Sequence, residues 1–410
     1  MAAFITHASV RLGLVAAIAA VLAMGPLQPA AAQIKLGFVG GLSGSCAPLV
    51  DSQLKGLKLA MADFNRAGGV NGTPVELVVR DGKTEPDESA TAARDLIVNE
   101  KVDLLTGPCS SAVLLAVSSV VKEEKVPTYA TIAGTTRISI EFGHEYLYLI
   151  GDNAYIEPRA IAEFVAKQPW NRIATVALDF EWGQQLVKVF EEYLKELKPD
   201  AVITRKLWPG FNESNFSSII VPALSDDPDV ILSVTFGDST TNLINQGRGY
   251  GMLERTKLLI FMPLDTLKTM GKEMPEGIYG FQRAPFYALP GEGVEAFVSA
   301  YQSAHGEYPD DWAVLGYDGF RQVFAAAARA GSVEHAALRE ALTGQPYTGL
   351  RGTMVVRAID GTNNSPVFIG QTAHTGEYDF PVLENVVSIT GLSLLPDPAL
   401  IEQRREAAKN

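Results

Sequence analysis

Apolar and polar positions alternate in blocks along this chain, and the blocks predict strands that alternate with helices. After Val102 a short apolar run ends at Thr106-Gly107-Pro108, and apolar residues then recur at i, i+3, i+4, i+7 and i+8 from Val113. The run predicts a buried strand, and the spacing predicts one face of a helix. A second apolar run, Thr128–Ile132, follows. Two such strands joined by a helix form a βαβ unit with parallel strands.

The same pattern continues through two successive halves and predicts an α/β fold with two Rossmann-like lobes, each a largely parallel sheet covered on both faces. Strands are predicted at Ile34–Val39, Val75–Val79, Val102–Leu105, Thr128–Ile132, Tyr146–Ile150, Ile173–Leu178, Ala201–Thr204, Val230–Val234, Lys257–Phe261, Ile278–Phe281, Gly352–Arg357 and Pro366–Ile369. No linker rich in Pro, Gly or Ser separates the halves, so we expect a hinge between them. The charged residues 398–410 are expected to form a frayed tail.

The first 32 residues predict a secretory signal peptide. They contain Arg11, an apolar core from Leu12 to Met24, and three alanines before Gln33. This is the arrangement of a cleaved signal, and its core is too short to span a bilayer. No cysteine stands near the cleavage site, so a lipid anchor is not expected. We therefore expect a soluble periplasmic protein, cleaved near Ala32.

Charge and motif content argue against several function classes. The net charge of -13 gives no electrostatic basis for nucleic-acid binding. No histidine pair has metal-ligand spacing, and no phosphate-binding or dinucleotide-binding loop is present, so neither a metal nor a cofactor is expected. Cys109 stands beside Ser110, but no histidine lies near enough in sequence to suggest a base. We expect no catalytic residues and no enzyme activity.

The predicted strand ends carry the candidate binding residues. Ser110 and Ser111 follow one strand, and Ala133, Gly134 and Thr135 follow the next. Ligands bind outside the carboxyl ends of parallel strands, and a helix N-terminus with nearby hydroxyls suits a carboxylate. The alternative is that both serines only cap the helix.

Two cysteines, Cys46 and Cys109, each follow a predicted strand. If those strands are neighbours, their loops meet at one rim, and an exported pair can form a disulfide. Two free buried thiols are the alternative.

Three segments give the chain a resemblance to a known family. They are IKLGFVGGLSG, GLKLAMADFNRAGGVNGTPVELVVRDGKTEPDESATAARDLIVNEKVDLLTGPCSS and WAVLGYDGFRQVFAAAARAG. The chain resembles the type I periplasmic solute-binding proteins of the branched-chain amino acid (Leu/Ile/Val-type) ABC transporters. The resemblance implies two lobes joined by a three-segment hinge, with the ligand in the cleft between them. Crossings are expected near Asp152, Pro285 and Tyr347, which gives residues 33–151 with 285–346 for lobe 1, and 152–284 with 347–397 for lobe 2.

The resemblance also assigns roles to individual residues. Ser110 resembles the family's carboxylate-binding serine, and the turn Ala133-Gly134-Thr135 matches its second carboxylate contact, with a register uncertainty of one residue. Trp182 and Phe236 stand where relatives place aromatic residues against the ligand, and Tyr155 near the hinge is a further candidate. Core packing is the alternative for these aromatic residues.

Two departures from the family pattern affect specificity and pairing. Relatives commonly place an ammonium-binding glutamate where this chain has Leu264 and then Asp265. If Asp265 faces the cleft, the resemblance implies an aliphatic amino acid as ligand. If it does not, an aromatic or other organic acid is implied, and we favour the second. The family's usual partner for Cys109 is replaced by Lys83, which leaves Cys46.

We therefore expect a monomeric receptor that captures a small carboxylate-bearing solute and delivers it to an ABC permease in the inner membrane. A sensor that reports to a membrane kinase or chemoreceptor is the alternative function. A hydrolase is a third and less favoured interpretation.

Overall fold

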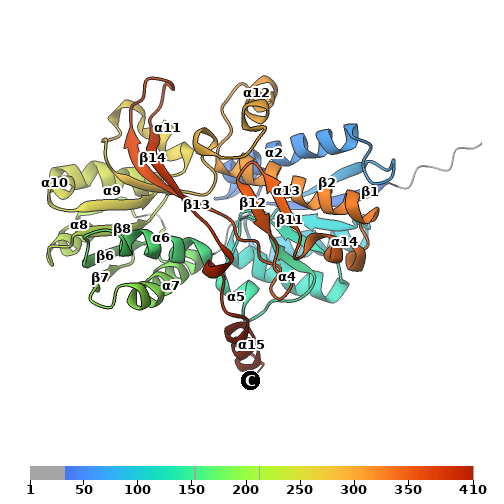
Figure 1. The fold of residues 1–410 in the computed structure, drawn as a ribbon, viewed down its shortest axis with the longest axis horizontal. Coiled ribbons are helices and arrows are strands. Elements are labelled where there is room, and N and C mark those ends of the chain that lie inside the picture. The colour runs from blue at the N-terminus through green and yellow to red at the C-terminus, as the bar shows by residue number, and fades with distance from the viewer. Residues whose placement is uncertain (1–32, 152–153, 212, 410) are drawn as a thin grey trace, which may run out of the picture. The chain divides into compact units, whose positions relative to one another are not determined.

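The computed structural model describes residues 33–151, 154–211 and 213–409. The described residues from Ile34 onward form one compact unit (Figure 1). The predicted signal segment 1–32 and the predicted crossing at Asp152 lie outside the described residues. The described part of the chain contains no helix long and apolar enough to cross a membrane.

The first sheet has five parallel strands in the order β2-β1-β3-β4-β5. They are β1 (Ile34–Gly40), β2 (Val75–Asp81), β3 (Leu104–Thr106), β4 (Thr128–Ala130) and β5 (Leu147–Leu149). Successive side chains of a strand point to opposite faces. Accordingly, Phe38 belongs to a core cluster with residues of helices α2 (Ala47–Arg66) and α13 (Asp311–Ala330). Its neighbour Val39 belongs to a second cluster with α3 (Pro86–Val98) and α4 (Ser111–Glu124).

The second sheet has seven strands in the order β14-β13-β10-β9-β8-β6-β7. Strands β6, β7, β8, β9 and β10 are parallel to one another. Strand β13 pairs antiparallel with β10, and β14 pairs antiparallel with β13. Their bounds are β6 (Arg172–Ala177), β7 (Val202–Leu207), β8 (Val230–Val234), β9 (Lys257–Phe261), β10 (Tyr279–Gln282), β13 (Val367–Ala373) and β14 (Val382–Ile389). The predicted α/β fold with two largely parallel sheets is confirmed. Strand β14 was not predicted, because Glu384 and Asn385 interrupt its apolar run.

Helices of the second half cover its sheet, and α6 packs against α7. These helices are α6 (Ile156–Ala166), α7 (Glu181–Leu197), α8 (Ser217–Leu224), α9 (Asp238–Gly249), α10 (Met252–Arg255), α11 (Leu264–Met270) and the 3-10 turn η1 (Gly271–Glu273). After β10 come the 3-10 turn η2 (Phe286–Ala288), then α12 (Val294–His305), α13 and α14 (His335–Leu342). Helix α13 packs along α2 of the first half, so the chain returns there after building most of the second sheet.

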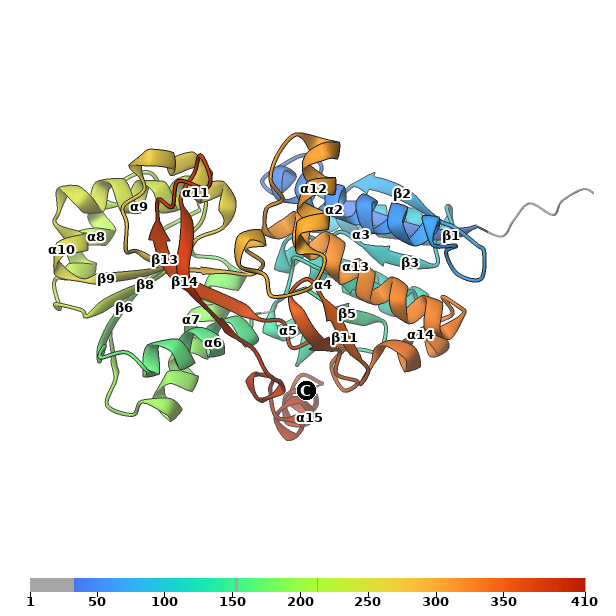
Figure 2. The ribbon, with the colours of Figure 1, turned by 45° about the horizontal axis from the view of Figure 1, so that its top comes forward.

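A two-stranded hairpin, β11 (Pro346–Gly349) and β12 (Gly352–Val355), follows α14 (Figure 2). Arg351 in its turn is fully buried and donates from Nε to Asp318 of α13 at 3.0 Å. Its Nη2 donates to the carbonyl of Ile150 at 3.1 Å. The hairpin is therefore fastened to α13 and to the end of β5. The predicted lobe boundaries remain predictions.

The charged end of the chain is helical over most of its described residues, which differs from the expected frayed tail. After the 3-10 turn η3 (Leu392–Leu394), Pro398–Ala407 form helix α15, which Asp397 caps by accepting from the N–H of Ala399 at 2.8 Å. Ile401 of this helix is fully buried. Arg405 donates to the carbonyls of Ser139, Ile140 and Ile359. The charged composition of this segment gave no sign that Ile401 would be buried or that Arg405 would donate to backbone carbonyls.

Candidate binding site

A cavity of about 150 Å³ lies where loops after the first sheet's strands meet loops of the second sheet. We call it the sheet-edge cavity. A cavity of about this volume accepts one benzene ring in another protein. Its lining comprises Ser45, Cys46, Leu49, Thr84, Cys109, Ser110, Ser111, Ile132, Ala133, Gly134, Phe180, Trp182, Phe211, Phe236, Phe261, Pro263, Asp265, Arg283 and Trp312.

The turn after β3 brings Ser110 and Ser111 to the cavity. Gly107 has φ of +111°, and a Cβ atom there would lie 2.5 Å from the carbonyl oxygen of Val39. Only glycine fits this close, left-handed turn. Ser110 then caps α4, its Oγ accepting from the N–H of Val113 at 3.2 Å. The N–H groups of the first helical turn give this corner a partial positive charge that suits a carboxylate, although the Ser110 cap already uses the N–H of Val113.

Only part of the second turn, which follows β4, reaches the cavity. Ala133 and Gly134 line the cavity, whereas Thr135 does not and is fully buried. Thr135 caps the short helix α5 (Thr136–Ser139) by accepting from the N–H of Arg137, and its hydroxyl donates to Glu181 of α7 at 2.8 Å. The predicted carboxylate contact in this turn had a register uncertainty of one residue, and Thr135 is the residue of the turn that does not reach the cavity.

Cys46 and Cys109 form a disulfide across the same rim. Their Cα atoms lie 6.4 Å apart, and 63 residues separate them in the chain. The pairing follows from the sheet order, because β1 and β3 are neighbours and each cysteine lies in the loop after one of them. Both cysteines line the cavity, so the bond fixes part of its wall.

Aromatic rings from the second half form much of the remaining wall. Trp182 and Phe236, both singled out from the sequence, have ring centroids 6.3 Å apart. Phe180 and Phe211 join them, with centroids 6.0 and 5.5 Å from that of Phe236. These two were not predicted, although Phe180 lies two residues before Trp182. Tyr155 does not line the cavity; the guanidinium of Arg159 lies 5.1 Å from its ring centroid.

A buried arginine also lines the cavity and was not predicted. The Arg283 guanidinium lies 5.3 to 5.5 Å from the ring centroids of Trp182, Phe261 and Trp312. Its Nε and Nη2 donate to the two carboxylate oxygens of Glu157 at 3.0 and 3.2 Å, and Glu157 is fully buried. The indole N–H of Trp182 donates to the same carboxylate at 2.9 Å.

This arrangement satisfies a buried charge pair and holds Trp182 in place, because one carboxylate accepts from both side chains. The backbone N–H groups of Arg283 and Ala284 donate to Asp311 Oδ1 at 3.0 and 2.8 Å. The sequence signal was Glu157 itself, a charged residue among the apolar positions of α6.

Asp265 is the one carboxylate among the described lining residues. Its side chain is open to the cavity, yet protein surrounds it, and this burial raises the pKa of its carboxyl. The N–H of Thr266 and the charge of Lys268 oppose the rise in pKa. No ion pair to Asp265 occurs among the described residues. Asp265 is thus an acceptor available to a bound group.

The described residues contain no cluster of three His, Cys, Asp or Glu side chains that could hold a metal ion. What the cavity offers is a helix N-terminus with hydroxyls, an apolar aromatic wall, one carboxylate and one neutralised arginine. Such a lining can bind a small organic anion, orient it by its carboxylate and cover its body with rings. Ligand contact by the predicted residues remains a prediction.

Comparisons with known proteins bear on the family and the fold of this chain. A family model described as periplasmic binding protein matches residues 33–377. The Leu/Ile/Val-binding protein homolog 7 of Brucella abortus is 26% identical over 332 residues, which are 77% of this chain and 82% of that protein.

Two solved structures illustrate the range of bound molecules. A solute-binding protein of an ABC transporter from Rhodopseudomonas palustris, in complex with 3,4-dihydroxybenzoic acid, has a TM-score of 0.78 at 22% identity, covering 90% of this chain and 99% of that one. A branched-chain amino acid transporter substrate-binding protein from Streptococcus pneumoniae, in complex with isoleucine, has a TM-score of 0.75 at 21% identity, covering 88% and 100%. At such identities these likenesses establish the fold alone.

Proposed function

Because this chain belongs to the periplasmic binding protein family, we propose that it is an exported receptor for a small carboxylate-bearing solute. The single observation that carries the proposal is the sheet-edge cavity. It joins the N-terminus of α4, with Ser110 and Ser111, to a wall of aromatic rings. A carboxylate at a helix N-terminus receives charge-assisted hydrogen bonds, and the rings cover the apolar body.

We infer further that the body of the solute is a single aromatic ring. Six aromatic side chains contribute to the lining, whereas its aliphatic side chains are those of Leu49, Ile132, Ala133 and Pro263. Aromatic pairs gain about 0.5–1.5 kcal/mol beyond the area they bury. The Rhodopseudomonas relative with 3,4-dihydroxybenzoic acid supports this inference, and the Streptococcus relative with isoleucine supports the alternative.

Asp265 bears on the choice between an amino acid and an aromatic acid. The resemblance to the family implied an amino acid as ligand if Asp265 faces the cleft, so the presence of Asp265 in the lining favours an ammonium group. An ammonium, however, has three donors to satisfy, while a ring hydroxyl needs one acceptor. Asp265 is the one carboxylate of the described lining, so an ammonium there would have a single carboxylate for its three donors. We therefore propose a hydroxylated aromatic acid, with its hydroxyl donating to Asp265.

A thermal-shift screen of the protein from Gln33 onward tests this proposal, with 4-hydroxybenzoate, benzoate, phenylalanine and leucine as probes. A ligand at 100 times its dissociation constant adds about 2.7 kcal/mol to the free energy of unfolding. We expect 4-hydroxybenzoate to give the largest shift. Asp265→Asn should reduce that shift toward the benzoate value, and the exposed control Asp200→Asn should not.

Stabilisation by leucine and not by either benzoate would overturn the aromatic assignment and make Asp265 the ammonium partner. Stabilisation by none of the four carboxylates would contradict the proposed ligand class. Delivery to an ABC permease is tested by uptake. Deleting the gene should abolish uptake of the labelled ligand by whole cells, and unchanged uptake would count against a transport role.

A further inference from the structure

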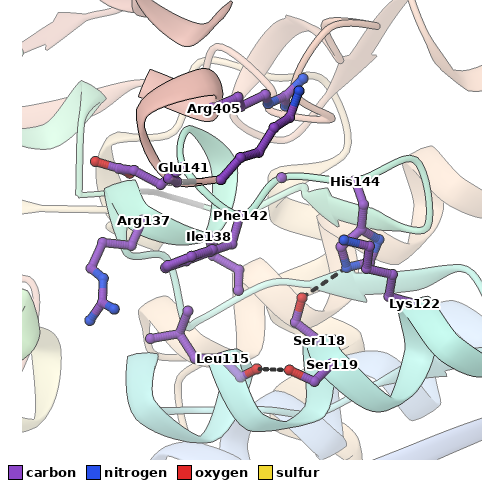
Figure 3. A pocket seen from close by; sticks show the side chains of 13 residues that line it. Leu115, Ser118, Ser119, Lys122, Arg137, Ile138, Glu141, Phe142, His144 and Arg405 are labelled. Atoms are coloured by element: carbon purple, nitrogen blue, oxygen red, sulfur yellow. Dashed lines mark hydrogen bonds between the residues drawn. The ribbon is translucent and has the colours of Figure 1, made fainter. Parts of the chain in front are cut away.

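A second and larger cavity, of about 490 Å³, lies against the C-terminal helix α15 (Figure 3). We call it the α15 cavity. It shares no lining residue with the sheet-edge cavity. Helix α4, helix α5 with the loop after it, and α15 supply its walls. Its lining contains Leu115, Ser118, Ser119, Lys122, Arg137, Ile138, Glu141, Phe142, Gly143, His144, Arg405, Ala408 and Lys409.

Cationic side chains outnumber acidic ones in this lining, on a protein whose net charge is -13. Some are paired: Arg137 with Glu181 at 3.6 Å, and Lys409 with Glu406 at 2.9 Å. Glu141, the acid of the lining, is paired with Arg404 at 3.5 Å through Oε1, and its buried Oε2 has no hydrogen-bond partner among the described residues. The charges of Lys122 and Arg405 remain, because neither has an ion pair among the described residues.

Arg405 is the more constrained of these two cations. Its Nε donates to Ile140 at 3.1 Å, and its Nη2 donates to Ser139 at 3.2 Å and Ile359 at 3.0 Å, all through neutral carbonyls. Burial lowers the pKa of Arg405, while the charges of Asp360 and Glu402 oppose that shift from a distance. Within the described chain its Nη1 has no hydrogen-bond acceptor. A partly buried guanidinium with neutral partners is stabilised by a nearby anion.

A buried hydroxyl adds a neutral donor to the same cavity. The His144 Nδ1 accepts from the N–H of Tyr146 at 3.3 Å, so in the neutral ring Nε2 carries the proton. That nitrogen lies 2.8 Å from Ser118 Oγ, which accepts from it (Figure 3). Burial, with the charges of Lys122 and Arg405, lowers the pKa of His144 to about 4, which keeps the ring neutral at pH 7. Ser118, only 4% exposed, keeps its own proton to donate.

We propose that the α15 cavity binds a small amphiphilic anion, a carboxylate or phosphate on a short apolar chain. Lys122, Arg405 and the Ser118 hydroxyl would hold the anionic group. Leu115, Ile138 and Phe142 would contact the apolar chain. The volume of the cavity falls in the range of about 300–1,000 Å³ found for small-molecule sites. This site is independent of the solute proposed for the sheet-edge cavity.

Isothermal titration of the protein from Gln33 onward tests the proposal with octanoate, octyl phosphate and 1-octanol. Octanoate or octyl phosphate should bind with saturation, and the tighter of the two identifies the anionic group. The uncharged alcohol should bind more weakly. Lys122→Gln should weaken binding of the anion about tenfold, as expected for loss of one charge-assisted contact.

Lys188→Gln is the matched control, since Lys188 is also an exposed helical lysine without an ion pair among the described residues. It should leave the affinity unchanged. Ser110→Ala should also leave it unchanged, which separates this site from the sheet-edge cavity. The proposal is overturned if neither anion saturates, if octanol binds as tightly, or if Lys122→Gln binds like the unmodified protein.

Discussion

The sheet-edge cavity has two walls that are built by different means. The first wall, from the first half of the chain, presents Ser110, Ser111, Ala133 and Gly134 on turns directly after short parallel strands. The second wall presents rings from the start of α7 and from loops of the second half, namely Phe180, Trp182, Phe211 and Phe236. Backbone geometry and a disulfide fix the first wall, whereas side-chain packing and one buried ion pair fix the second. The polar end of the cavity thus rests on backbone geometry, and its apolar end rests on contacts between side chains that are distant in the sequence.

The largest expected effect comes from removing the covalent bond of the first wall. The double variant Cys46→Ala/Cys109→Ala opens a loop of 63 residues. The chain-entropy model gives a loss of about 4 kcal/mol in the free energy of unfolding. Urea unfolding followed by circular dichroism measures this loss, and the reduced unmodified protein is the control. An unchanged midpoint would mean that packing alone holds the first wall.

The matching change in the second wall is Glu157→Gln. It removes the negative charge that accepts from Nε and Nη2 of the buried Arg283 guanidinium, although an amide oxygen remains to accept one bond. We expect a loss of about 3 kcal/mol, at the low end for breaking a buried pair. Urea unfolding gives the value, and Glu196→Gln on the exposed side of α7 is the control. A loss equal to that of the control would show that the ion pair does not support this wall.

Ser110→Ala separates capping from ligand binding in the first wall. Loss of the bond to the Val113 N–H should cost about 1 kcal/mol of stability. If Ser110 also contacts the carboxylate, affinity for the carboxylate ligand should fall roughly tenfold. Ser119→Ala, in the same helix, controls for helix propensity. A stability loss with unchanged affinity would leave the serine as a cap only.

The smallest expected effect concerns Asp265 and pH. Its pKa is raised in the folded protein, so the folded state holds this proton more tightly than the unfolded state. Its ionisation therefore costs stability as pH rises from about 4 toward 7. Because the side chain is open to water, this cost is a few tenths of a kcal/mol. Without ligand, Asp265→Asn should be slightly more stable than the unmodified protein at pH 7 but not at pH 4, by thermal unfolding. The opposite order would contradict the raised pKa.

The sequence could predict the first wall much better than the second. Parallel strands end at one edge, so apolar runs followed by small polar residues locate Ser110, Ser111, Ala133 and Gly134 without tertiary information. The cysteine pairing was predicted on the condition that β1 and β3 are neighbours, and the sheet order meets that condition. The same reasoning did not show that the lining ends at Gly134 and leaves out Thr135.

The second wall depends on contacts between residues far apart in the chain. Arg283 and Glu157 are 126 residues apart, and no periodicity relates them. Phe211 lies in an irregular loop, where hydrophobic spacing carries no directional information. Helix α15 was missed for a similar reason, because its anchor Arg405 bonds to carbonyls 46 to 266 positions away.

Two of the four tryptophans of the chain, Trp182 and Trp312, line the sheet-edge cavity. Indole emission responds to the polarity and charge of its surroundings, and the Arg283 guanidinium lies near both rings. A solute that filled the cavity would change the surroundings of both rings. If the proposed binding is correct, the indole emission would report occupancy of the cavity without an attached dye.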